Sequence, residues 1–304
     1  MPFREQYRRQ VQLLVRALPF VAAEPCFAMK EGTAINLFIR DLPRLSVDID
    51  LTYLPVAPRP ESLAAIDAVL RRIAGAVGGG IRGSRVTPSA SREGTVTKLV
   101  VRAEGVQIKV EVTPVLRGCV YEPRMMDVSP NVEEAFGFAE MRLVSFADLY
   151  GGKIVAALDR QHPRDLFDIR DLLATEGIDD ALRRAFVVYL LSHDRPMAEV
   201  LTARPKDIAG EFERGFAGMT AEPVSLDELL AARDELVAAI VGGMPDDHRR
   251  FLILFERGEP EWGLLGIEGA ADLPAVRWRQ RNLDTLNAGA RATLVAQLER
   301  VLSA

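Results

Sequence analysis

Residues 30–51 read KEGTAINLFIRDLPRLSVDIDL, and the pattern of this stretch is the strongest indication of the fold. Near its end, apolar residues at positions 47, 49 and 51 alternate with Asp48 and Asp50, which predicts a strand with one apolar face. Side chains two residues apart lie on the same face of a strand, so both carboxylates are expected to point the same way. Two neighbouring carboxylates repel each other unless a cation lies between them, and Mg²⁺ bound to phosphates is a usual solution. The alternative interpretation is an edge strand with a solvated polar face.

The beginning of the same stretch holds Gly32 and Thr33, where a short apolar strand over 20–29 is expected to enter a helix over 34–40. Backbone N–H groups, the Thr33 hydroxyl and the helix dipole together predict an anion site at this turn. The alternative is a plain helix cap with a flexible glycine.

A second strand is predicted over 106–113, because valine and isoleucine occupy positions 106, 108, 110 and 112. Gln107, Lys109, Glu111 and Thr113 then share the opposite face. Glu111 is therefore a candidate third carboxylate beside the Asp48 and Asp50 pair. The alternative is an ordinary cross-strand face of lysine and glutamate.

The rest of the chain predicts an α+β fold: a mixed N-terminal domain over 1–140 and a helical domain over 141–304. In the first domain we expect a helix over 5–18, a helix over 62–77 that ends at Gly78, and a hairpin that joins 95–103 to 106–113 through Glu104 and Gly105. Helices are predicted in the second domain over 145–160, 163–177, 179–192, 196–203, 206–216, 225–241 and 283–302.

Composition excludes several classes of protein. The 304 residues carry a net charge of −5, so a nucleic-acid partner must meet a local basic surface. Two cysteines exclude a disulfide scaffold, and three histidines far apart in the sequence argue against a histidine-based metal site. Neither a signal peptide nor a membrane-spanning run is recognisable, so we expect a soluble, cytoplasmic protein without membrane contact.

Gly-Thr followed by Asp-x-Asp, with a third acid on a later strand, resembles the DNA polymerase β-like nucleotidyltransferase superfamily. Three segments narrow the resemblance: GTAINL from Gly32, RLSVDIDL from Arg44, and KIVAALDR-x₃-RDLFD from Lys153 to Asp168. Together they look like the AbiEii/AbiGii family of nucleotidyltransferase toxins, found in bacterial toxin–antitoxin and phage-defence systems. One position departs from that family, because Glu31 stands where the family typically has glycine, and its charge would oppose a phosphate.

The resemblance implies a magnesium-dependent enzyme that transfers NMP from an NTP to an acceptor hydroxyl, with release of pyrophosphate. The acceptor would be the 3′ end of tRNA or another RNA, and a cognate antitoxin would be a partner. Alternatives are nucleotidylation of a protein hydroxyl, or an inactive nucleotide- or RNA-binding protein of the same fold. Implied ligands of two Mg²⁺ ions are Asp48, Asp50 and Glu111, and the last of these could also act as the base. Implied nucleotide-binding residues are Gly32, Thr33, Ser46, Lys153 and Asp168.

The helical domain contributes Lys153, which the resemblance places at the phosphates across an interdomain cleft, and Asp165, its favoured final catalytic acid, with Asp168 as second choice. The alternative interpretation, from the residues alone, is that Lys153 extends its charged end to solvent. Arg164 and Asp168 then read as an ordinary ion pair one helical turn apart.

Two basic segments are candidate RNA contacts, with solvated charged surface as the alternative for each. The first segment contains Arg82, Arg85, Arg92, Lys98, Arg102 and Lys109, and the second contains Arg277, Arg279, Arg281, Arg291 and Arg300.

Ser46 is predicted to share the face of Asp48 and Asp50 if the strand already includes residue 46. Phosphorylation of Ser46 would then block catalysis. The alternative is that Ser46 only satisfies a backbone group in the loop before the strand.

Overall fold

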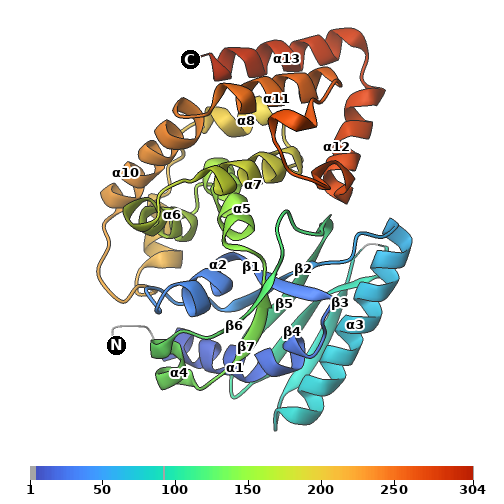
Figure 1. Ribbon diagram of the computed structural model, residues 1–304. Coiled ribbons are helices and arrows are strands. Elements are labelled where there is room, and N and C mark those ends of the chain that lie inside the picture. The colour runs from blue at the N-terminus through green and yellow to red at the C-terminus, as the bar shows by residue number, and fades with distance from the viewer. Residues whose placement is uncertain (1–4, 92, 304) are drawn as a thin grey trace. The chain divides into compact units, whose positions relative to one another are not determined.

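The computed structural model describes residues 5–91 and 93–303 and divides the chain into two compact units. The first unit runs to Ser145 and also includes Ala217–Pro223, which returns from the second half of the chain. The second unit comprises Phe146–Phe216 and the residues from Val224 onward. Within the described residues, strands occur in the first unit and helices alone form the second (Figure 1). The predicted α+β class is confirmed.

A seven-stranded mixed sheet forms the first unit, with the strand order β3-β4-β5-β2-β1-β7-β6. Strand β2 runs parallel to β5, and β1 runs parallel to β7, whereas the other neighbours are antiparallel. The strands are β1 (Phe27–Lys30), β2 (Asp48–Tyr53), β3 (Arg85–Ala90), β4 (Val96–Ala103), β5 (Val106–Arg117), β6 (Arg124–Asp127) and β7 (Glu140–Leu143).

One face of this sheet is covered by helices, because the apolar side chains of the strands alternate toward it. Leu99, Val101, Ile108 and Val110 are buried on that face, where α1 and α3 pack. The opposite face carries the polar residues of the same strands. The helices of this unit are α1 (Glu5–Ala22), α2 (Glu31–Ala34) with its π-helical continuation η1 (Ile35–Ile39), α3 (Arg59–Gly80) and α4 (Pro130–Phe136).

The second unit is built around the close packing of α5 on α7. A Cβ atom at Gly151 would lie 3.0 Å from the backbone nitrogen of Phe186, so only glycine allows the two helices to approach this closely. The helices of this unit are α5 (Phe146–Asp159), α6 (Pro163–Thr175), α7 (Asp180–Leu191), α8 (Met197–Thr202), α9 (Ala209–Glu211) with η2 (Phe212–Phe216), α10 (Leu226–Val237) with η3 (Ala238–Gly242), α11 (Asp246–Arg257), η4 (Trp262–Leu264), η5 (Ala270–Asp272), α12 (Pro274–Thr285) and α13 (Ala288–Leu302).

Some expected elements differ in the structure. The strand predicted over 20–29 is wrong in its first part, because α1 continues to Ala22 and the strand starts only at Phe27. The apolar residues Leu14, Leu18 and Val21 are all buried at helical spacing, so the helical period of α1 extends into this stretch. Three glycines at the end of α3 remain helical rather than stopping the helix early. None of the described helices combines the length and apolar character that a membrane span requires.

The hairpin between β4 and β5 forms where it was predicted. Glu104 and Gly105 have φ angles of 52° and 76°, which is the left-handed pair of a tight two-residue turn. This turn fixes the register of the two strands, and with it the face on which Glu111 lies.

Candidate functional site

The three carboxylates singled out in the sequence lie on neighbouring strands of one sheet. Asp48 and Asp50 occupy alternate positions of β2, and the parallel register of β2 and β5 places Asp50 opposite Glu111 and Asp48 opposite Lys109. Alternation along both strands therefore puts all three carboxylates on the face opposite α1 and α3. The structure brings these three residues together on two adjacent interior strands of the sheet.

Asp50 lies in the most negative part of this arrangement. The pKa of Asp50 is raised to about 6: burial is the largest cause, the charges of Glu31, Asp48 and Glu111 add to the rise, and Lys30 opposes it. The part of the rise that comes from the neighbouring carboxylates reflects negative charge that a bound cation would neutralise. The donor set, which consists of carboxylate oxygens alone, suits Mg²⁺.

Two lysines neutralise the other carboxylates. Lys98 on β4 forms an ion pair with Glu111, and Lys109 Nζ lies 3.9 Å from Asp48 Oδ1. Within residues 5–91 and 93–303, no group of three or more histidine, cysteine, aspartate or glutamate side chains is gathered closely enough to hold a metal ion. The side chains of both pairs are between 33% and 41% exposed, so each lysine can exchange its carboxylate for another partner.

The Gly32–Thr33 turn is tied to the start of β2. The Thr33 hydroxyl is hydrogen-bonded to the backbone carbonyl of Asp48 and lies 2.9 Å from Ser46 Oγ. A carbonyl only accepts, so Thr33 donates its proton to Asp48 and the Ser46 hydroxyl donates to Thr33. These contacts fix the backbone of Asp48 beside the turn.

Ser46 lies before the strand rather than in it, because β2 begins at Asp48. Its side chain is buried, with a relative exposure of 7%. The condition under which Ser46 would share the face of the carboxylates by strand alternation is therefore not met. Its contact in the structure is with Thr33.

Arg44 is a residue at this site that the sequence analysis quoted without giving it a role. Its side chain is 1% exposed, and its Nη1 donates to the Leu45 carbonyl at 3.1 Å. A Cβ atom at Gly32 would lie 2.7 Å from Arg44 Nη2, so the glycine leaves room for the guanidinium. The signal in the sequence was an arginine among apolar residues, which is costly to bury unless it has a fixed position.

The segment that holds Arg44 in place comes from far along the chain. Arg44 forms an antiparallel bridge with Thr220, and the Leu45 N–H donates to the Met219 carbonyl at 2.8 Å. Ala217–Pro223 thus pairs with the loop that leads into β2. No pattern in the sequence indicated this pairing, because short loop segments carry no periodicity.

Glu31 adopts a backbone conformation that favours glycine. Its φ angle is 64°, in the left-handed region, where a side chain costs roughly 1–2 kcal/mol. Its carboxylate lies 3.5 Å from Lys30 Nζ and is the second cause of the raised pKa of Asp50. The position at which the sequence departs from the AbiEii pattern is therefore one where the structure itself favours glycine.

Lys153, Asp165 and Asp168 form a buried cluster inside the helical unit. Lys153 Nζ lies 2.9 Å from Asp165 Oδ1 and 3.2 Å from Asp168 Oδ2, and the Lys153 side chain is 2% exposed. Burial by itself would raise the pKa of Asp165, but the charge of Lys153 and the hydrogen bond from Arg160 outweigh it and lower the pKa. Lys153 therefore does not extend to solvent, and it links α5 to α6.

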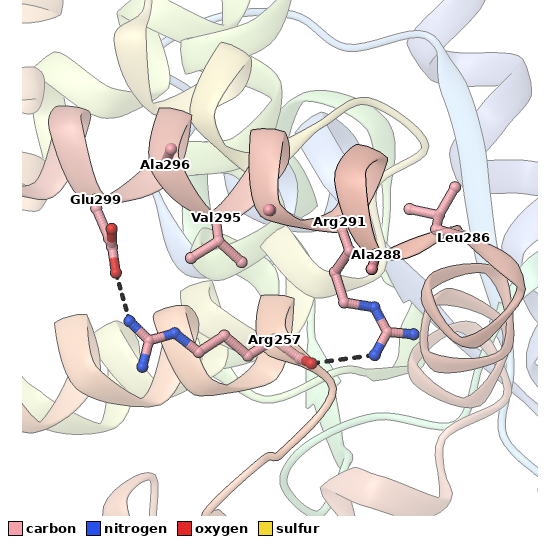
Figure 2. Close-up of a pocket in the computed structure, with 8 residues that line it drawn as sticks. Arg257, Leu286, Ala288, Arg291, Val295, Ala296 and Glu299 are labelled. Carbon is pink, nitrogen blue, oxygen red and sulfur yellow. Dashed lines mark hydrogen bonds and ion pairs between the residues drawn. The ribbon is translucent and has the colours of Figure 1, made fainter.

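Two cavities that described residues of the helical unit line are candidates for ligand binding. One of about 530 Å³ lies between α11 and α13 (Figure 2). Its arginines are already engaged, since Arg257 is 2.5 Å from a Glu299 carboxylate oxygen and Arg291 Nη1 donates to the Arg257 carbonyl at 3.1 Å. This cavity also includes part of the second basic segment, whose Arg277 and Arg279 pair with Asp272 and Glu256.

The other cavity, of about 1140 Å³, is lined by residues of α5, α8, η3 and α13 among others. Arg195 on its wall pairs with Asp159 and Glu199, and Lys206 Nζ donates to the Asp159 carbonyl at 2.6 Å. The two acids of its lining, Asp159 and Glu199, both pair with Arg195, so this cavity lacks a set of carboxylates on one face like that of β2 and β5. The polar face of the sheet is therefore the better candidate site.

Comparisons with known proteins find a matching family and a similar fold. The sequence matches the family profile described as "Nucleotidyl transferase AbiEii toxin, Type IV TA system" over residues 12–282, which is most of the chain. No curated protein sequence matches it. The structure is similar to that of MenT4, a nucleotidyltransferase toxin from Mycobacterium tuberculosis H37Rv, with a TM-score of 0.61, 17% identity, and coverage of 92% of this chain and 95% of that chain. At this identity the likeness supports the fold.

Proposed function

This chain belongs to the AbiEii nucleotidyltransferase toxin family of type IV toxin–antitoxin systems, and from that premise we propose the reaction it performs. We propose that it transfers NMP from an NTP to the 3′-hydroxyl of tRNA, with Mg²⁺ as the cofactor, as the toxin of a phage-defence system with a cognate antitoxin. The observation that carries the proposal is the placement of Asp48, Asp50 and Glu111 on one face of adjacent strands.

Asp48, Asp50 and Glu111 would hold the metal, and two Mg²⁺ ions would balance the charge that raises the pKa of Asp50. When bound, Mg²⁺ neutralises charge on the phosphates and lowers the barrier to in-line displacement. The oxygen of the acceptor hydroxyl forms a bond to the α-phosphorus as the bond from that phosphorus to the leaving oxygen of pyrophosphate breaks. Glu111 would either accept the hydroxyl proton as the base or hold the metal as a ligand.

The Gly32–Thr33 turn would receive the triphosphate through its backbone N–H groups, and the absence of a side chain at Gly32 lets the Arg44 guanidinium lie beside the turn. Thr33 and Ser46 contribute through the network that fixes Asp48, and Arg44 contributes a buried positive charge beside the turn. Thr33, Ser46 and Arg44 act as positioning residues in this proposal. A role for Lys153, Asp165 and Asp168 in transfer remains a prediction, and their contacts support a structural role as well.

The test is incubation of the protein with each labelled NTP, Mg²⁺ and total cell RNA, followed by separation of RNA from protein. Label at the 3′ end of tRNA supports the proposal, and loss of this label in Asp50→Asn ties it to the carboxylates. Label on protein instead supports nucleotidylation of a protein hydroxyl.

The strained and negatively charged Glu31 favours one further candidate, an inactive nucleotide-binding protein of this fold. Nucleotide binding without transfer to any acceptor would support that candidate. Recovery of transfer in Glu31→Gly would show that this single residue is the cause.

A further inference from the structure

The polar face of the sheet continues from the carboxylates on β2 and β5 across two further strands, β4 and β3. The pairing of β5 with β4 puts Lys98 opposite Glu111 and Arg102 opposite Gln107, and the pairing of β4 with β3 puts Arg85 opposite Arg102. Cross-strand partners lie on the same face of a sheet, so these side chains share the face of Asp48 and Asp50. β3 lies three strand spacings from β2, which is about 14 Å.

On the strands beyond β2, this face is strongly basic. On β3, β4 and β5 its charged residues are four cations against one acid, Glu111. The four cations are Arg85, Lys98, Arg102 and Lys109. Of the other residues in the first basic segment, Arg82 lies in a turn outside the strands, and Arg92 lies outside the described residues.

Arg85 and Arg102 lie directly opposite each other, an arrangement that costs stability because like charges on paired strands repel. Both side chains are exposed. Arg102 Nε donates to the Gln107 side chain at 3.2 Å, but within the described part of the chain neither arginine has a carboxylate within ion-pair distance. An anionic ligand would remove this repulsion.

The composition of the face distinguishes a nucleic acid from a protein partner. Protein interfaces have an apolar or aromatic centre. Where β3, β4 and β5 pair, the face offers one apolar side chain, the half-buried Val100, among Thr87, Ser89 and Gln107. A row of cations without an apolar centre suits a phosphate backbone.

We infer that the open face of β3, β4 and β5 binds the phosphate backbone of the acceptor polynucleotide and delivers its 3′ end to the carboxylates on β2. This inference rests on the proposed function for the direction of the strand, but the binding surface does not depend on the chemistry. Arg85 and Arg102 are the outer contacts, and Lys98 and Lys109 are the contacts nearest the reacting end.

The ion pairs of the two lysines couple this surface to the metal ligands. Lys98 is held by Glu111, and Lys109 is near Asp48. When Glu111 and Asp48 bind metal, both lysines lose their partners and become available to phosphates. Neutralising Glu111 therefore strengthens nucleic-acid binding even though it removes a metal ligand.

The experiment measures the affinity of the full chain for a fluorescent RNA stem-loop with a single-stranded 3′ tail, without NTP, as a function of salt. Arg85→Glu/Arg102→Glu weakens binding at least tenfold and lowers the slope of log K against log[salt] by about 1.5, the value for two lost contacts. The matched control is Arg71→Glu/Arg72→Glu, which makes the same change of charge on α3, the helix on the other face. The control stays within twofold of the wild type.

Equal weakening in both double variants, or wild-type affinity in Arg85→Glu/Arg102→Glu, overturns the inference, as does a wild-type chain that does not bind the RNA. Glu111→Gln is expected to bind the RNA several-fold more tightly, and unchanged affinity overturns the exchange of Lys98. Circular dichroism shows that each variant is folded, and unchanged NTP binding shows the same for the two arginine double variants. RNA binding that depends on Arg85 and Arg102 without any transfer contradicts the proposed function alone. Transfer to RNA at wild-type kcat/KM by Arg85→Glu/Arg102→Glu contradicts this inference alone.

Discussion

Lysine meets carboxylate in both units of the molecule, but in opposite environments. On the sheet, the Lys98–Glu111 pair and the Lys109–Asp48 contact are about one-third exposed. In the helical unit, Lys153 and its two aspartates are at most 3% exposed. Exposed ion pairs contribute little to stability, whereas breaking a buried one leaves an uncompensated charge in a medium of low polarity.

Because of this difference, the exposed carboxylates on the sheet can exchange lysine for another cation, whereas the buried aspartates can do so only at a large cost in stability. A carboxylate on the sheet gives up its lysine at small cost, which is what a metal ligand requires. Asp165 and Asp168 lose Lys153 only at a large cost, so their first role is to hold α5 and α6 together.

Asp48→Asn and Asp50→Asn should have the largest effect on activity. Each removes a metal-binding charge, and we expect transfer to fall by at least on the order of a hundredfold. Because these side chains lie on the polar face, the urea midpoint should change little. Transfer of labelled NMP and urea unfolding measure the two effects.

The matched control for these variants is Asp127→Asn, an exposed carboxylate on the edge strand β6, which should keep wild-type transfer. Full activity in Asp48→Asn would refute the assignment of the metal ligands.

Lys153→Met should have the largest effect on stability. It leaves Asp165 and Asp168 without their shared cation, and the expected loss is about 3–5 kcal/mol of unfolding free energy. Lys98→Met, which breaks an exposed pair, should change the urea midpoint only slightly. Urea unfolding followed by circular dichroism makes this comparison.

The triple variant Lys153→Met/Asp165→Asn/Asp168→Asn sharpens the test, because it removes the buried charges together and should recover part of the lost stability. If Lys153→Met is as stable as Lys98→Met, the cluster is not a structural pair. Milder destabilisation than in Ile154→Ala, which truncates a buried apolar side chain of the same helix, would also argue against it.

Acidification should distinguish the two regions with a smaller effect. The pKa of Asp165 is lowered in the folded state, so its stabilising contribution is complete above its unfolded pKa of about 3.9 and is lost as the pH falls below that value. Between pH 5 and pH 3 the wild type should therefore lose stability more steeply than Asp165→Asn. Urea midpoints measured at several pH values provide the slopes, and parallel slopes would contradict the prediction.

The sequence was sufficient for the parts of the site that follow from strand periodicity. The alternation around Asp48 and Asp50 predicted β2, and the alternation around Glu111 with the turn at Glu104 predicted the β4–β5 hairpin. Both patterns are local, and period two leaves no choice of face once the apolar side is buried. The order of the strands, which puts Asp50 opposite Glu111, was not readable from either segment alone.

Other features could not be predicted because they depend on distant parts of the chain. The edge strand β3 has no buried face, so its sequence lacks alternation, and its position beside β4 appears only in the structure. The pairing of Arg44 with Thr220 joins two loops without a pattern. The burial of Lys153 depends on α6 rather than on the residues beside it, which is why exposure seemed reasonable from the sequence.

Glu31→Gly should have the smallest effect. It tests a position beside the sheet carboxylates where the backbone is strained and the side chain adds a negative charge. Glycine removes the cost of a side chain at a φ of 64°, offset in part by its larger entropy when unfolded, so stability should rise by up to about 1 kcal/mol. Loss of the Glu31 charge should also lower the pKa of Asp50 and tighten NTP binding. Glu31→Ala is the matched control, since it removes the charge but keeps the unfavourable backbone conformation. Both variants should therefore bind NTP more tightly, but only Glu31→Gly should show a higher urea midpoint. If Glu31→Ala gains as much stability as Glu31→Gly, charge repulsion rather than backbone strain is the cost at this position; if neither variant changes NTP affinity, the triphosphate does not lie beside this turn.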